Sequence, residues 1–133
     1  LARFAARMVD LLPTDTEVLA GLELGGVPIA TAMSLASGLP AVFVRKQAKT
    51  YGTCRAVEGG EVLERHVVIV EDVISTGGAV ADAATLLRSE GAVLQTVVCA
   101  IWRGVGQAHI AADPALRVKP ALTADDLNVA LDG

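Results

Sequence analysis

The sequence predicts an α/β fold, with a mostly parallel central sheet and helices on both of its faces. Short apolar runs rich in valine, isoleucine and leucine alternate along the whole chain with alanine- and leucine-rich segments of helical length. That alternation is typical of strand–helix–strand units joined by right-handed crossovers. The chain is 53% hydrophobic but only 3% aromatic, so its core must be built from aliphatic side chains. Its 133 residues suffice for one domain, spanning 1–133, with a buried core.

The first half of the chain is expected to contain two helices and two strands before a long loop. The expected elements are a helix over 1–12, a strand over 17–22, a helix over 27–37 and a strand over 41–44. Pro13 ends the first helix, and the second has a proline in its first turn and closes at Gly38. Residues 45–61 are polar, basic and glycine-containing, with little periodicity. They predict a long flexible loop with hairpin edges, and a loop of that length usually has a function.

The second half continues the alternation. The expected elements are a strand over 67–70, a helix over 78–90, strands over 94–101 and 116–122, and a helix over 124–131. The first of these strands is a continuous β-branched run, which is typical of a strand buried on both faces of a parallel sheet. Gly91 is placed to close the helix that follows it, and Thr123 to cap the last one.

Charge and cysteine content exclude several classes of function. The net charge of −4 argues against general nucleic-acid binding, which needs a basic surface. Cys54 and Cys99 form no CxxC pair, so a disulfide scaffold or a zinc site is not indicated, and a reducing cytoplasm is the expected location. The apolar runs are too short to span a membrane. The chain begins at Leu1 inside the first expected helix, which predicts a longer natural protein whose N-terminal part is missing.

The most informative segment is the end of the strand over 67–70 and the turn after it. Two acids, Glu71 and Asp72, follow the strand, and a turn of hydroxyl and glycine residues over 75–79 leads into a helix. Acids at the carboxyl edge of a parallel sheet can bind sugar hydroxyls or a metal, and backbone N–H groups at a helix N-terminus can bind phosphate. The turn has neither the lysine of a P-loop nor a GxGxxG pattern. An acidic strand end with an ordinary N-cap is the simpler alternative, which the complete pattern disfavours.

Three further segments are candidates for the same site. Arg45, Lys46 and Lys49 form a basic cluster in a stretch without acids between Glu23 and Glu58, suited to a diphosphate but also to a plain solvated loop. The other two candidates are the glycine-containing strand-end loop over 21–28, whose N–H groups suit diphosphate, and Trp102-Arg103 at the end of the strand over 94–101. A tight turn and a surface arginine are their respective alternatives. His66 and His109 have no suggested partner and are expected to be structural or exposed.

The strand, acids and turn closely resemble the phosphoribosyl-pyrophosphate (PRPP) motif of type I phosphoribosyltransferases. The resemblance implies that Glu71 and Asp72 contact the ribose hydroxyls, directly or through Mg²⁺ and water, and that the turn holds the 5′-phosphate. The PRPP-binding residues that it implies are Arg45, Lys46, Lys49, Tyr51, Glu71, Asp72, Val73, Ile74, Ser75, Thr76, Gly77, Gly78 and Ala79. No protein side chain is expected to bind the metal directly.

The pattern RKxAKxxG at Arg45 is similar to the catalytic loop of orotate phosphoribosyltransferases. The resemblance implies catalytic roles for Lys49, Asp72 and Tyr51, the last at a position where many members have histidine. It implies orotate binding by Ser75 and Arg103, a homodimer whose loop acts in trans, and a role in pyrimidine nucleotide biosynthesis. Trp102 replaces an aspartate that often stands there, some members carry lysine at Gly25, and an N-terminal hood segment would be missing.

Two alternatives remain open from the sequence. One is a type I phosphoribosyltransferase for a purine or another base, because Arg103 and the missing N-terminal segment would form the base pocket. The other is a non-catalytic PRPP-binding regulatory domain, against which Lys46 and Lys49 argue, because such proteins lose the catalytic loop.

Overall fold

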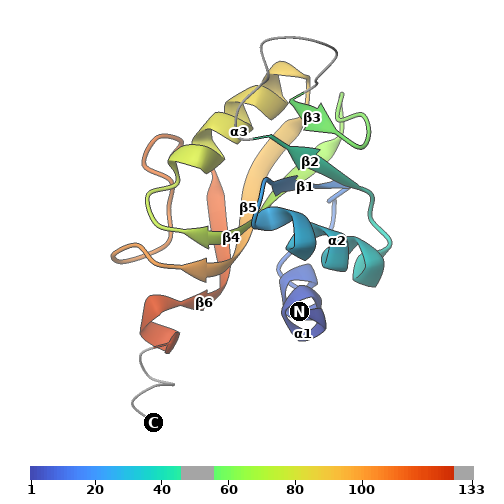
Figure 1. Cartoon of the computed structure of the whole chain (residues 1–133). Coiled ribbons are helices and arrows are strands. Elements are labelled where there is room, and N and C mark those ends of the chain that lie inside the picture. Colours follow the sequence, from blue (N-terminus) through green and yellow to red (C-terminus); the bar gives the residue numbers. More distant parts are fainter. Residues whose placement is uncertain (46–55, 128–133) are drawn as a thin grey trace.

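The computed structural model describes residues 1–45 and 56–127 (Figure 1). Its helices are α1 (Ala2–Val9), α2 (Gly26–Ser37) and α3 (Gly78–Ser89). Its strands are β1 (Val18–Leu22), β2 (Ala41–Val44), β3 (Val57–Glu58), β4 (His66–Ile74), β5 (Val93–Trp102) and β6 (Arg117–Thr123). Within the described ranges no helix has the length and apolar character needed to cross a membrane.

The strands form a six-stranded sheet in the order β3-β2-β1-β4-β5-β6. All neighbours pair in parallel except β3, which runs antiparallel to β2 and gives the expected hairpin edge. From β1 the chain crosses through α2 to β2 on one side, and from β4 it crosses through α3 to β5 on the other. The direction of winding therefore reverses between β1 and β4, and such a reversal opens a crevice at the carboxyl ends of the strands.

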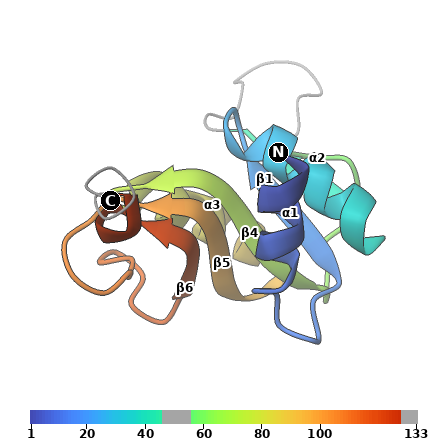
Figure 2. The same ribbon diagram turned by 90° about the horizontal axis from the view of Figure 1, so that it is seen from below.

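Helices cover both faces of the sheet, as predicted. On one face α1 and α2 pack against Leu19, Val68 and Val98, and on the other α3 packs against residues that include Ala20 and Ile69. Successive residues of β1 and β4 thus enter opposite cores, as the two-residue period of a strand requires. Figures 1 and 2 show α3 on the opposite side of the strands from α1 and α2.

Most predicted boundaries agree with the structure, but two predictions are wrong. Helix α1 ends at Val9 and does not continue to residue 12, and β4 is longer than predicted. The strand does not end at Val70: it continues through the acids to Ile74, because its ladder to β5 runs on to the pairs Val73–Ile101 and Ile74–Trp102. Gly38 closes α2 in the left-handed conformation, as expected.

The end of β6 also agrees with the prediction. The hydroxyl of Thr123 accepts a hydrogen bond from the backbone N–H of Asp126 at 3.2 Å, and an Asp126 carboxylate oxygen accepts one from the N–H of Thr123 at 2.8 Å. This reciprocal cap starts a helical turn at residue 124. The remainder of that expected helix, over 128–131, lies outside the described residues.

Candidate active site

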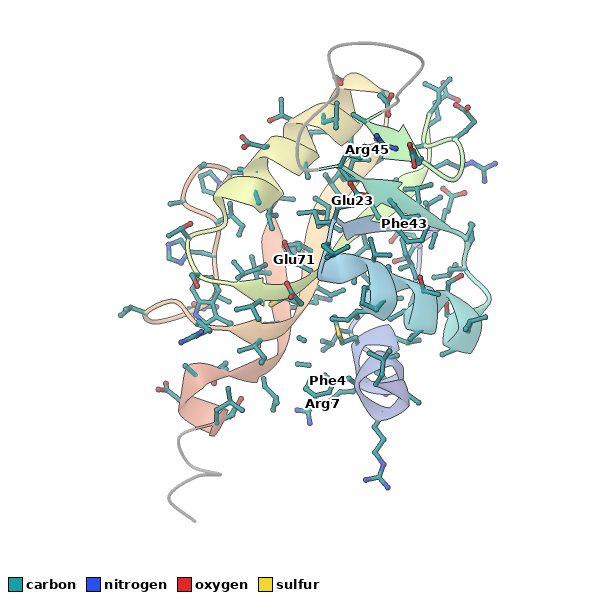
Figure 3. All side chains as sticks on the ribbon, viewed as in Figure 1. Phe4, Arg7, Glu23, Phe43, Arg45 and Glu71 are labelled. Atoms are coloured by element: carbon teal, nitrogen blue, oxygen red, sulfur yellow. The ribbon has the colours of Figure 1, made fainter. Side chains whose placement is uncertain are left out.

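The predicted site residues that the structure describes lie near the carboxyl ends of the parallel strands. The loop after β1, the acids near the end of β4 and the N-terminal ends of α2 and α3 meet there, because β1 and β4 are adjacent parallel strands. Figure 3 shows Arg45, Glu23 and Glu71 on this side of the molecule, near the carboxyl ends of β2, β1 and β4. The sheet therefore brings together segments that are about fifty residues apart in the sequence.

Both acids are held by the backbone of their own strand. A Glu71 oxygen accepts a hydrogen bond from the N–H of Asp72 at 3.0 Å, and Asp72 Oδ1 accepts one from the N–H of Val73 at 2.7 Å. Both residues are half-buried. Since they follow each other on a strand, they face opposite sides of the sheet, with Asp72 toward the N-terminus of α2.

The loop over 21–26 fits against Asp72 because it contains glycine. A Cβ atom added at Gly25 would lie 2.0 Å from Asp72 Oδ2, and one at Gly26 would lie 2.4 Å from the carbonyl oxygen of Val70. The Glu23–Leu24 peptide in this loop is cis. The predicted diphosphate loop thus packs directly on the second acid, a contact that the sequence did not reveal.

The turn after β4 leads into α3 through a glycine in the left-handed conformation. Gly77 caps α3 with φ +82°, a left-handed conformation that favours glycine. A Cβ atom on it would lie 2.4 Å from Cδ1 of the buried Ile110, a residue for which we predicted no role. Ser75 and Thr76 are exposed, and the first N–H groups of α3 follow them. This arrangement offers hydroxyl and backbone donors to an anion.

Two residues of the turn region differ in how they face the site. Val73 is exposed, whereas the side chain of Ile74 is buried in the core on the α3 side. Because of this burial, only the backbone of Ile74 can reach a ligand.

The β4–β5 ladder places Arg103 beside Ser75. Ile74 pairs with Trp102, and the Ile74 carbonyl accepts a hydrogen bond from the N–H of Arg103 at 2.8 Å. Ser75 and Arg103, the two residues predicted to bind orotate, therefore leave the sheet side by side and are both exposed. Because they leave adjacent strands at the same level, one ligand can contact both side chains.

Trp102 supports the loop that follows Arg103. It is 3% exposed, and its indole N–H donates to the carbonyl of Gly106 at 3.0 Å. Its ring lies 5.9 Å from the ring of His109. His109 also contacts the carbonyl of Gln107 through Nδ1 at 2.9 Å, which agrees with the structural role expected of this histidine.

The first cation of the basic cluster is already paired. Arg45 forms an ion pair with Glu58 across the β2–β3 hairpin, and its backbone N–H donates to the carbonyl of Ala56 at 2.8 Å. Its Nε is buried without a hydrogen-bond partner among the described residues. We predicted no role for Glu58, although it is the acid that ends the acid-free stretch. Lys46, Lys49 and Tyr51 lie outside the described residues.

The electrostatic field of the acids reaches the core beneath them. Burial, with the negative charges of Glu71 and Asp72, raises the pKa of the Cys99 thiol to about 12. Within the described residues no group of three or more histidine, cysteine or acidic side chains is placed to hold a metal ion.

Comparison with known proteins identifies the family. Residues 1–120 match the model of the phosphoribosyl transferase domain. An orotate phosphoribosyltransferase of Nocardioides sp. is 54% identical over 130 residues, which cover 98% of this chain and 73% of that protein.

Two solved structures are also similar. The orotate phosphoribosyltransferase from Aeropyrum pernix has a TM-score of 0.85 at 27% identity, covering 98% of this chain and 75% of that one. The Mycobacterium tuberculosis H37Rv enzyme, in complex with PRPP, has a TM-score of 0.76 at 31% identity, covering 95% and 74%.

The chain belongs to the phosphoribosyltransferase family, of type I. Within that family it is most like the orotate phosphoribosyltransferases. The resemblance predicted from the acid pair, the turn and the basic loop is therefore confirmed, as is the predicted fold class.

Proposed function

We propose that this chain transfers the phosphoribosyl group of PRPP to orotate, giving orotidine 5′-phosphate and diphosphate. The observation that carries the proposal is the register of β4 and β5, which brings the acids, the phosphate turn and Arg103 to one edge of the sheet. That order matches the parts of the two substrates: ribose hydroxyls, 5′-phosphate and a carboxylated base. Relatives that carry this name, one of them 54% identical, support the proposal.

The chemistry asks the protein to position two substrates and to stabilise a leaving diphosphate. Asp72 and Glu71 accept hydrogen bonds from the ribose hydroxyls, while Ser75, Thr76 and the N–H groups at the start of α3 bind the 5′-phosphate. The bond from C1 of ribose to the diphosphate oxygen breaks as the base nitrogen attacks, and positive charge develops at the ribosyl centre. Held in place on the β4 strand, the carboxylates stabilise that charge without reorganisation.

The leaving diphosphate requires positive charge. We assign this role to Lys46, Lys49 and Arg45, and we propose that Tyr51 donates a hydrogen bond to the diphosphate. We propose that Arg103 binds the carboxylate of the base. The proposed cofactor is Mg²⁺, which neutralises diphosphate charge when bound; Glu71 and Asp72 would hold it through water and substrate oxygens.

Four further features are proposed from the family resemblance: the location, the oligomeric state, the pathway and the way in which the basic loop acts. The enzyme is a cytoplasmic homodimer of pyrimidine nucleotide biosynthesis. The basic loop over 45–61 acts in trans, so that Lys49 contributes to the active site of the neighbouring subunit.

Mixed dimers of Lys49→Ala and Asp72→Asn chains test whether the loop acts in trans. If it does, each mixed dimer has one intact site and is active; if it acts in cis, neither site is intact.

A base-selection assay tests the proposed reaction. Diphosphate release from PRPP and Mg²⁺ is measured with orotate, uracil, hypoxanthine or adenine, for the parent protein and for Arg103→Ala. Of the four bases, we expect only orotate to cause diphosphate release. In the Arg103→Ala variant we expect a large increase in the KM for orotate. Release with a purine base instead would indicate another base specificity, and PRPP binding without release for any base would indicate a regulatory domain.

A further inference from the structure

A polar cavity lies at the opposite end of the sheet from the site described above. Its volume is about 410 Å³, and it is formed at the amino ends of β4, β5 and β6 together with the segment that joins α1 to β1. The strand rises about 20 Å between His66, which lines the cavity, and Asp72 six residues later. A ligand in the cavity would therefore not touch the candidate active site.

An irregularity in the sheet shapes the cavity floor. Val67 pairs with Leu94 but Val68 pairs with Thr96, so Gln95 is an extra residue on β5. In a regular strand the neighbours Gln95 and Thr96 would face opposite sides, whereas here both line the cavity. Within the described ranges Thr96 is the one polar residue that is buried, with 4% of its surface exposed. Its hydroxyl makes no hydrogen bond to another described residue.

The cavity wall carries more positive than negative charge, in a chain of net charge −4. Arg117 and Lys119 lie two residues apart on β6, on the same face, and Arg117 pairs in register with Thr96. Lys119 donates a hydrogen bond to the carbonyl of Leu11 at 3.3 Å, which holds its ammonium group at the cavity. The guanidinium of Arg117 has no partner among the described residues, so its donors are available.

The opposing charge on the wall is small. Among the described residues that line the cavity Asp15 is the one acid, and it already faces His66 at 3.4 Å. Glu17, which follows the cavity residue Thr16, accepts a hydrogen bond from the backbone N–H of His66 at 3.1 Å and forms an ion pair with Arg65. The two cations of β6 therefore have no acidic partner at the cavity, where the hydroxyls of Thr14 and Thr96 also lie.

We propose that this cavity binds a phosphate monoester carried on a small organic group, at a site separate from that of the substrates. Arg117 provides a planar fork of N–H donors and Lys119 a point charge, a pair suited to the two charges of a phosphate monoester. The hydroxyl of Thr96 can donate or accept a further hydrogen bond there. The volume exceeds what inorganic phosphate occupies, and Val67, Val68 and Val93 give the rest of the space an apolar wall.

Backbone amide chemical shifts of the whole protein test the proposal, because they report the two phosphate-binding regions separately. Inorganic phosphate and adenosine 5′-monophosphate are titrated at constant ionic strength. We expect saturable shifts at residues 95–96 and 117–119, in addition to those at the turn over 75–79, with tighter binding of the nucleotide than of phosphate in the cavity. Shifts confined to 75–79 would overturn the proposal. Equal affinity of the cavity for phosphate and for the nucleotide would contradict the part of the proposal that requires an organic group on the phosphate.

Substitutions identify the residues that bind the probe. Arg117→Gln with Lys119→Gln is expected to weaken the cavity titration at least tenfold and leave that at 75–79 unchanged. Arg3→Gln, on the exposed side of α1, is the matched control and should change neither. Arg117→Gln alone replaces an exposed side chain without partners, so it keeps the test valid if the double variant is unstable. Unchanged cavity affinity in the folded Arg117→Gln variant would refute the assignment.

Discussion

Replacing Gly25 by alanine should damage the acid pair without damaging the fold. Gly25 has φ −65° and ψ −29°, a conformation open to any residue, so its backbone does not require glycine. The obstacle is Asp72: the new Cβ would lie 2.0 Å from Oδ2, 2.3 Å from Cγ and 2.8 Å from Oδ1. Ordinary contact begins at 3.4 Å, so the carboxylate or the loop must move by at least 1 Å.

That displacement sets the expected magnitude. A misplacement of about 1 Å in a positioned catalytic group costs on the order of a hundredfold in rate. We therefore expect Gly25→Ala to lower kcat/KM for PRPP by about that factor at saturating orotate. The thermal unfolding temperature should change little. Alanine in place of glycine at the start of a helix stabilises the folded state by up to about 1 kcal/mol, which offsets the cost of the local rearrangement.

A double-mutant cycle separates this cause from a general disturbance. If Gly25→Ala acts by displacing Asp72, it should cost little more once Asp72 has been replaced by alanine, so the two losses should not multiply. Leu35→Ala is the control, since this side chain lies on the same helix, α2, and is exposed to solvent. Activity of Gly25→Ala within threefold of the parent, or losses that multiply in the double variant, would refute the argument. The first outcome would mean that the loop moves and that Asp72 keeps its position.

Three further predictions concern the turn, the hairpin and the core. Gly77→Ala, at φ +82°, should cost about 1–2 kcal/mol in thermal unfolding and weaken PRPP binding, whereas Gly78→Ala, with open space around it, should not be destabilising. Glu58→Gln should lower the KM for PRPP a fewfold, because it removes the charge that opposes Arg45; a higher KM would contradict this. With its pKa raised to about 12, the thiol of Cys99 should resist iodoacetamide at pH 8 until the protein is denatured, as located by mass spectrometry. The raised pKa also makes stability depend on pH. The thiol ionises near pH 9.0 in the unfolded chain but stays protonated in the folded protein, so its contribution to the free energy of unfolding declines as the pH rises from about 9.0 toward about 12.

The fold was predictable because its signals are local and repeated. The β-branched run at Val67, the proline and glycine that frame α2, and Thr123 before the last helical turn each specify a boundary through a few adjacent residues. The boundary of β4 was missed for the same reason. Glu71 and Asp72 look locally like the end of a strand, while the pairing that extends it depends on β5, about thirty residues later. Strand length in a parallel sheet is a property of the neighbours.

The site was predictable where one segment contains it and not where segments meet. The acids and the turn over 75–79 lie on consecutive residues, so their order alone indicates their chemistry. The contact of Gly25 with Asp72 and the pairing of Arg45 with Glu58 join residues that are 47 and 13 positions apart. Glycine is compatible with a turn anywhere, and an acid after a basic loop has many possible partners. Neither type of residue reveals its contact without the sheet order.

The length of β4 bears on the chemistry as well as on the fold. Had the strand ended at Val70, as its composition suggests, both acids would stand on a loop. Instead Glu71 pairs with Cys99 and Val73 with Ile101, so the backbone on both sides of Asp72 belongs to a hydrogen-bonded ladder. Carboxylates fixed on a strand keep their geometry better than carboxylates on a loop, and stabilising charge that develops in a transition state depends on that geometry. The extension of β4 by four residues thus gives the acids a rigid position, and the glycine-containing turn begins only after Ile74, where a backbone open to phosphate is needed.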